Sequence, residues 1–141
     1  MEGFYAPRLE EAGGIGALGV DVVQSGHHGR RTSNSMVWMD RVSPNDGASR
    51  NVIMGISSAH IRSPHQEVLD NILHDDRLGV GRIWTTTVAQ LGKTAPELVD
   101  ADGGRVVMST FDGGNGYIVQ ALTEEGELLD SRAFPAVACG Q

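Results

Sequence analysis

The 141-residue chain contains one cysteine, Cys139, which excludes an internal disulfide and a zinc cluster built from several thiolates. No apolar run approaches the roughly 20 residues that cross a bilayer. The start, Met1-Glu2-Gly3, lacks the charged and apolar regions of a signal peptide. These absences predict a cytoplasmic protein with no membrane partner.

Positive charge is also scarce, because 11 Lys and Arg residues stand against 18 Asp and Glu residues, for a net charge of −7. A protein that binds nucleic acid through its phosphates needs a basic surface, so the charge argues against that class. Arg30 and Arg31 form a local exception. They indicate either a solvated turn or, together with Thr32 and Ser33, a contact with an anionic group of a substrate through charge-assisted hydrogen bonds.

The remaining composition is typical of a globular domain. Hydrophobic residues make up 40% of the chain and charged residues 21%. This length predicts one domain with one core. We expect that domain to span residues 1–135 and to be followed by a short tail, 136–141. The 19 glycines indicate many turns rather than long helices.

The most informative segment is residues 21–33, where a short apolar strand leads directly into His27-His28-Gly29. Imidazole is the commonest metal ligand in proteins, and a strand end holds a ligand firmly because the sheet fixes its backbone. A glycine beside the ligands allows a sharp turn. The segment therefore indicates a metal site, although two adjacent histidines also fit an ordinary surface turn.

Local patterns predict α/β structure. Short apolar runs predict strands over 20–23, 52–56 and 80–86. Ser33 or Asn34 is expected to cap a helix over residues 35–42. A second helix is predicted to have Ser63 as its N-cap and Pro64 as its first residue. It should run to about His74 and present Val68, Leu69, Ile72 and Leu73 to the sheet.

The C-terminal third has the pattern of an antiparallel meander. Strands are predicted over residues 105–111, 117–123 and 127–134, after an irregular stretch from 93 to 104. The glycine-rich segment 112–116 has neither P-loop nor EF-hand spacing, so we interpret it as a hairpin turn.

The order of these segments resembles the C-terminal half of metallo-β-lactamase-fold hydrolases, most closely the ComEC-like group. In that group a strand of the form D-V-L-K-V leads into H-H-G-S-x-x-S. A buried strand, a helix opened by H-P and containing E-V-L, and a strand ending near a threonine then follow. The matching residues here are His27-His28-Gly29, Pro64, Glu67-Val68-Leu69 and Thr85-Thr86, within roughly residues 15 to 110. Arg30 and Ser63 depart from the pattern, because the family usually has serine and histidine there.

The resemblance implies half of an αββα metallo-β-lactamase-type sandwich, with a mixed sheet, covering helices and the C-terminal meander. The family's N-terminal half carries the motif H-x-H/D-x-D-H, and a later G-D element adds a bridging aspartate. This chain contains neither motif. The domain is therefore expected to be incomplete, and its open sheet face should be covered by a missing N-terminal half or by a second copy.

The resemblance also implies one or two zinc ions in a completed site, where bound water becomes hydroxide near neutral pH. His27 or His28 would supply one metal ligand. Expected substrate contacts are Arg30, Thr32, Ser33, His60 and His65, although the last two also fit surface positions. We expect the chain alone to bind zinc weakly and to be inactive. The alternative is a non-catalytic structural or protein-interaction module derived from the same fold.

Overall fold

A computed structural model describes residues 20–31, 33–35, 38, 42, 50–55, 63–72, 80–87, 95 and 97–136. Its first sheet contains four parallel strands in the order β1-β2-β3-β4. These strands are β1 (Val22–Gln24), β2 (Arg50–Met54), β3 (Val80–Thr85) and β4 (Leu98–Asp100). The predicted mixed sheet is therefore wrong for this layer, since every pair of neighbouring strands is parallel.

Strand β4 lies in the stretch that we expected to be irregular. It has only three residues, and so short a run shows no alternation of apolar and polar residues along the chain. Its place is set by pairing with β3, where Ile83 is opposite Leu98 and Trp84 is opposite Val99. Tertiary pairing forms this strand, and local sequence does not signal it.

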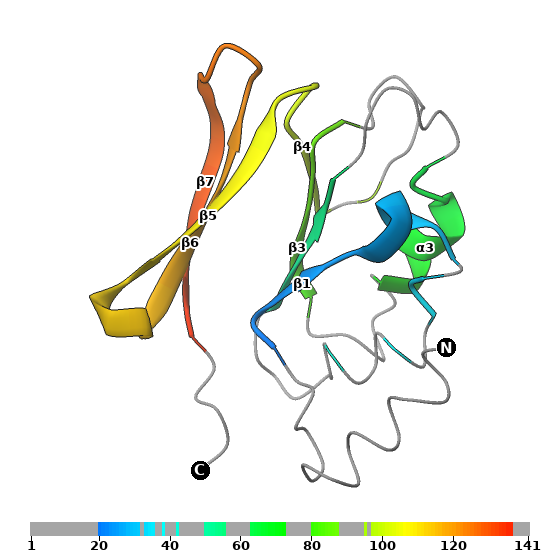
Figure 1. Cartoon of the computed structure of the whole chain (residues 1–141), viewed down its shortest axis with the longest axis horizontal. Helices are drawn as coiled ribbons and strands as arrows, with labels where there is room; N and C mark the ends of the chain where they lie inside the picture. Colours follow the sequence, from blue (N-terminus) through cyan, green and yellow to red (C-terminus); the bar gives the residue numbers. More distant parts are fainter. Residues whose placement is uncertain are drawn as a thin grey trace, which may run out of the picture.

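Helix α3 (Gln66–Ile72) packs on one face of the parallel sheet (Figure 1). Val68, Leu69 and Ile72 are buried against residues of β1, β2 and β3, which confirms these three positions of the predicted apolar face. Leu73 and the expected helix end near His74 lie outside the described residues. No helix in the described ranges is long and apolar enough to cross a membrane.

The predicted N-cap of α3 is wrong. The amide nitrogens of Val68 and Leu69 donate to the carbonyl oxygen of His65, at 2.9 and 3.4 Å, and the helix begins at Gln66. Ser63 is fully buried, and its hydroxyl accepts a hydrogen bond from Arg30 Nε at 3.3 Å. The Ser63 side chain, which the local pattern predicts to cap the helix, therefore binds Arg30 from a distant part of the chain instead.

The second sheet is the predicted meander, here β5 (Arg105–Phe111), β6 (Gly116–Leu122) and β7 (Leu128–Pro135). The order is β5-β6-β7, both pairings are antiparallel, and every strand end lies within one residue of its expected position. Glycine and acidic residues in the connections, such as Asp112 and Gly126 with positive φ, explain why the turns were readable from sequence.

The meander covers the face of the parallel sheet opposite α3, so that a helix, a parallel sheet and an antiparallel sheet form three layers (Figure 1). Trp84, Val99 and Ala101 on one side pack with Tyr117, Val119 and Ala121 on the other. The expectation of an open sheet face is therefore wrong, because the chain's own C-terminal strands bury that face.

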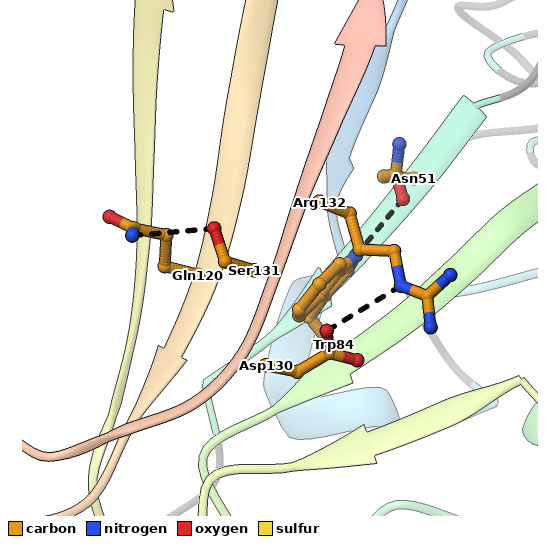
Figure 2. A network of polar contacts seen from close by, with 6 residues as sticks. All are labelled: Asn51, Trp84, Gln120, Asp130, Ser131 and Arg132. Atoms are coloured by element: carbon orange, nitrogen blue, oxygen red, sulfur yellow. Dashed lines mark hydrogen bonds and ion pairs between the residues drawn. The ribbon is translucent and has the colours of Figure 1, made fainter.

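A chain of hydrogen bonds crosses between the two sheets inside this second core. Trp84 Nε1 donates to Asn51 Oδ1 at 2.9 Å (Figure 2), and Asn51 Nδ2 donates to the Tyr117 hydroxyl at 2.9 Å. The hydroxyl donates in turn to the carbonyl oxygen of Asp21 at 3.2 Å. Polar atoms that would be costly to bury alone therefore satisfy one another.

This network makes stability sensitive to high pH. Burial raises the pKa of the Tyr117 hydroxyl above 10.0, and the negative charge of Asp21 adds to the rise, although the Asn51 hydrogen bond and Arg50 oppose it. The unfolded chain therefore loses this proton first. The stabilisation is fully present below pH 10 and is lost as the pH rises through the folded-state pKa.

We expect the free energy of unfolding to fall more steeply above pH 10 in the wild type than in Tyr117→Phe. Urea unfolding of both proteins across this pH range measures the difference. A difference between them that stays constant with pH would contradict the shift.

Candidate functional site

The His-His-Gly segment forms a tight turn, Gly26–Gly29, directly after β1 at the carboxyl end of the parallel sheet. Both histidines have left-handed backbone conformations, with φ 48° and ψ 44° at His27 and φ 56° and ψ 36° at His28. Such a conformation costs a residue with a side chain about 1–2 kcal/mol. Two adjacent strained residues persist only where the surrounding structure stabilises them, and such strained residues are common at functional sites.

Asn34 supplies part of that support. This buried side chain donates through Nδ2 to the carbonyl oxygens of Gly26 at 3.0 Å and Arg30 at 2.6 Å, one on each side of the histidines. Its Oδ1 accepts a hydrogen bond from the buried Ser25 hydroxyl at 2.7 Å. The Asn34 side chain thus bridges the backbone on the two sides of the histidines.

The predicted capping roles of Ser33 and Asn34 are therefore wrong. Ser35 takes that place, since its Oγ and its carbonyl oxygen lie 3.3 and 3.1 Å from the amide nitrogen of Trp38. Trp38 and Val42 are helical and Ser35 is not, whereas residues 36, 37 and 39–41 of the expected helix lie outside the described residues. The sequence indicates a cluster of polar residues before the helix, but not which of them binds the histidine turn. Asn34 does so because the carbonyl oxygens of Gly26 and Arg30 lie within reach of its side chain.

Gly29 brings a distant segment against the turn. Its carbonyl oxygen accepts a hydrogen bond from the His65 amide at 3.1 Å, and its φ is +74°. A Cβ added at Gly29 would lie 2.6 Å from Pro64 Cβ and 3.2 Å from Met54 Sδ. Only glycine fits this close approach, which places the start of α3 beside the histidine turn.

The ring of His28 is oriented by the backbone of the neighbouring strand. Its Nδ1 lies 2.7 Å from the carbonyl oxygen of Gly55, the residue after β2. Because a carbonyl oxygen only accepts, Nδ1 carries the proton, and in the neutral ring the lone pair belongs to Nε2. A metal-binding histidine typically donates its other N–H in this way, which selects the tautomer and the ring orientation.

An open pocket of about 250 Å³ lies at this turn, lined by Gln24, Ser25, Gly26, His27, His28 and Gly55. His27 is exposed and His28 is half-buried. Their ring centroids are 6.3 Å apart, with an angle of 67° between the planes. Two imidazoles thus share one open pocket, which can present nitrogen donors to a cation.

The predicted substrate residues lie around this pocket rather than in its lining. Arg30 binds Ser63, Ser33 donates its amide to the Arg30 carbonyl oxygen at 3.1 Å, and His65 binds Gly29 through its backbone. The structure therefore gathers all three about the histidine turn, although none lines the pocket. Thr32 and His60 lie outside the described residues.

Neighbouring charges provide little further chemistry. Arg31 forms an ion pair with Glu67 at 3.9 Å, but both side chains are more than 60% exposed, and such pairs contribute little to stability.

Within the part of the chain that the structure describes, no three His, Cys, Asp or Glu side chains gather in a way that could hold a metal ion. The described residues alone therefore do not make up a metal site.

No protein-family model, curated protein or solved structure matches this chain.

Proposed function

We propose that this chain is the C-terminal portion of a metal-dependent hydrolase of the metallo-β-lactamase fold, with His28 as a metal ligand. The observation that supports this best is the 2.7 Å contact between His28 Nδ1 and the Gly55 carbonyl oxygen. That contact places the proton on Nδ1 and the lone pair on Nε2, as in a histidine that binds metal through Nε2. The sequence offers His27 and His28 as alternatives, and the ring orientation favours His28.

The position of the turn supports the same assignment. Ligand sites in layered α/β folds gather at the carboxyl ends of parallel strands, where loops present side chains from a rigid base. The histidine turn follows β1 there, and Gly55 follows the adjacent strand β2. Asn34 and Gly29 hold the turn in its strained shape, so His28 pays little additional ordering cost on binding.

The donor set fits part of a zinc site. Catalytic zinc takes about three protein ligands and keeps one position open, whereas this turn offers one or two imidazoles. The other ligands would come from an N-terminal half carrying H-x-H/D-x-D-H, or from a second chain. In a completed site, zinc lowers the pKa of bound water to about 7 and so supplies hydroxide for hydrolysis of a phosphoester, ester or amide.

The remaining role of this chain is to place the substrate. Arg30 uses one of its five N–H donors on Ser63, which steadies the side chain and leaves donors for an anionic group. Ser33 and His65 lie in the same loop cluster. With Thr32 and His60, they are the candidates for substrate contact.

A zinc titration of the full chain tests the ligand assignment. We expect weak binding, because the ligand set is incomplete. In NMR spectra recorded during the titration, the His28 Nε2 resonance should shift before that of any other histidine nitrogen. His28→Ala should weaken zinc binding by about tenfold or more. His65→Ala removes an imidazole outside the pocket lining and should leave the affinity unchanged.

Two results would reject His28 as the ligand. One is a neutral His28 ring with its proton on Nε2, and the other is a zinc affinity that is equal in His28→Ala and the wild type. If His27→Ala alone lowered the affinity, the ligand would be His27.

A non-catalytic structural or interaction module is the second candidate, favoured by the lack of a three-ligand cluster among the described residues. Co-expression with an upstream segment or neighbouring chain containing H-x-H/D-x-D-H distinguishes the two. The enzyme requires metal retention and hydrolysis that His28→Ala abolishes. The module is supported if neither histidine substitution changes metal content or activity.

A further inference from the structure

Among the described strands, β7 is an edge of the antiparallel sheet. It bonds to β6 on one side, and none of the described strands pairs with its other side (Figure 1). The opposite edge, β5, contacts β3 of the parallel sheet. Leu128 and Leu129 on β7 are 57% and 49% exposed. A long exposed edge strand with apolar side chains is a template for pairing with another strand.

The sequence of β7, Leu-Leu-Asp-Ser-Arg-Ala-Phe-Pro, is complementary to itself when two copies run antiparallel. If Ser131 is opposite Ser131 of a second copy, Asp130 of each copy lies opposite Arg132 of the other. The same register brings Leu128 and Leu129, where the β6–β7 pairing has an irregularity, against the Ala133 and Phe134 end of the other copy. Opposite charges and apolar side chains facing each other across strands both favour pairing.

The two charged side chains are well placed for this. Asp130 and Arg132 are opposite the alternate residues Ala121 and Val119 of β6, so both lie on the same face of the sheet. Arg132 Nε is 3.5 Å from Asp130 Oδ1 (Figure 2), and both side chains are partly exposed at the free edge. A second β7 would bring the opposite charges within the distance of directly paired residues, about 4.5–5.5 Å between Cβ atoms.

The charges also select one register. Moving the axis of symmetry by one residue toward the N-terminus places Asp130 opposite Asp130, and moving it by one toward the C-terminus places Arg132 opposite Arg132. Like charges directly opposite each other disfavour both alternatives. Only the axis at Ser131 pairs every charge with its opposite.

We propose that two copies of this chain associate through antiparallel pairing of their β7 strands about Ser131. The two three-stranded meanders then form one continuous sheet, and the interface is the same patch on both subunits, as in most dimers with two-fold symmetry. The proposal does not depend on the metal site, which lies at the other sheet.

Two complementary charge reversals test the pairing. In a dimer of Asp130→Arg, the new arginine of each copy would lie opposite Arg132 of the other copy. In a dimer of Arg132→Asp, the new aspartate would lie opposite Asp130, so like charges repel in both dimers. We expect each to raise the dimer dissociation constant about tenfold or more. An equimolar mixture of the two should form a heterodimer, because every facing pair then has opposite charges.

Sedimentation of the wild type, each variant and the mixture measures these states, with circular dichroism showing that each protein is folded. A wild type that remains monomeric at micromolar concentration would overturn the proposal. So would folded single variants that dimerise as well as the wild type, or a mixture with no more dimer than its parts.

Cross-linking at the axis tests the register. Directly opposite residues have Cα atoms about 4.5–5.5 Å apart, within disulfide range. In a Cys139→Ala background, Ser131→Cys should form a covalent dimer under mild oxidation. Ser109→Cys, an exposed serine on β5 at the other edge, is the matched control and should stay monomeric under denaturing conditions. Equal cross-linking of the two variants, or none at Ser131→Cys, would reject this register.

Discussion

Asn51→Ala is expected to lower the free energy of unfolding by about 3 kcal/mol. The substitution removes the acceptor for Trp84 Nε1 and the donor to the Tyr117 hydroxyl, and both groups are buried. A buried polar group left without its partner costs about 1–3 kcal/mol. Since a domain of this size has only about 5–15 kcal/mol of stability, this loss is large. Urea unfolding followed by circular dichroism measures it.

The matched control is Asn115→Ala, which removes the same side chain from an exposed turn where its hydrogen bond to Asp112 is 3.5 Å long. We expect a change below about 0.5 kcal/mol there. A double-mutant cycle of Asn51→Ala with Tyr117→Phe should give a combined loss smaller than the sum of the single losses, because both break one hydrogen bond. Strict additivity, or a loss at Asn51 no larger than at Asn115, would refute the role of the network.

Gly29→Ala is expected to destabilise the protein by about 3 kcal/mol or more and to disturb the histidine turn. The added Cβ meets Pro64 Cβ at 2.6 Å, and the backbone has φ +74°. The left-handed conformation alone costs alanine about 1–2 kcal/mol, and the overlap adds a further cost because the chain must shift. Urea unfolding gives the stability, and the His28 ring resonances report the geometry of the turn.

Gly113→Ala separates the two causes, since Gly113 has a similar φ of +66° but nothing within 4 Å of an added Cβ. That variant should lose only the conformational part, about 1 kcal/mol, with the His28 resonances unchanged. Equal losses at the two glycines would mean that the contact with Pro64 carries no energetic weight.

Much of the C-terminal meander could be predicted because its signals are local. The β-branched and aromatic residues between Arg105 and Phe111 and the glycine-rich turns are properties of adjacent residues, and antiparallel hairpins pair strands that are neighbours in sequence. The apolar face of α3 was predictable for the same reason, since Val68, Leu69 and Ile72 follow the period of a helix.

Strand β4 and the true role of Ser63 could not be predicted. Leu98–Asp100 is a strand because β3 lies beside it, and Ser63 turns inward because Arg30, which is 33 residues away in sequence, donates to its hydroxyl. The candidate site shows the same division. The sequence placed two histidines and a glycine after an apolar strand, but the proton position on His28 depends on the Gly55 carbonyl oxygen, which comes from the next strand.

By itself, then, the sequence determined the strands of the meander, the buried face of α3 and the residues gathered in the histidine turn, because local periodicity and turn chemistry encode them. Only the tertiary structure decided that the meander covers the parallel sheet, that Asn51 joins the two through Trp84 and Tyr117, and which nitrogen of His28 keeps its lone pair. Those features arise from contacts between residues distant in sequence. Their energies depend on burial and on partners that no local pattern specifies.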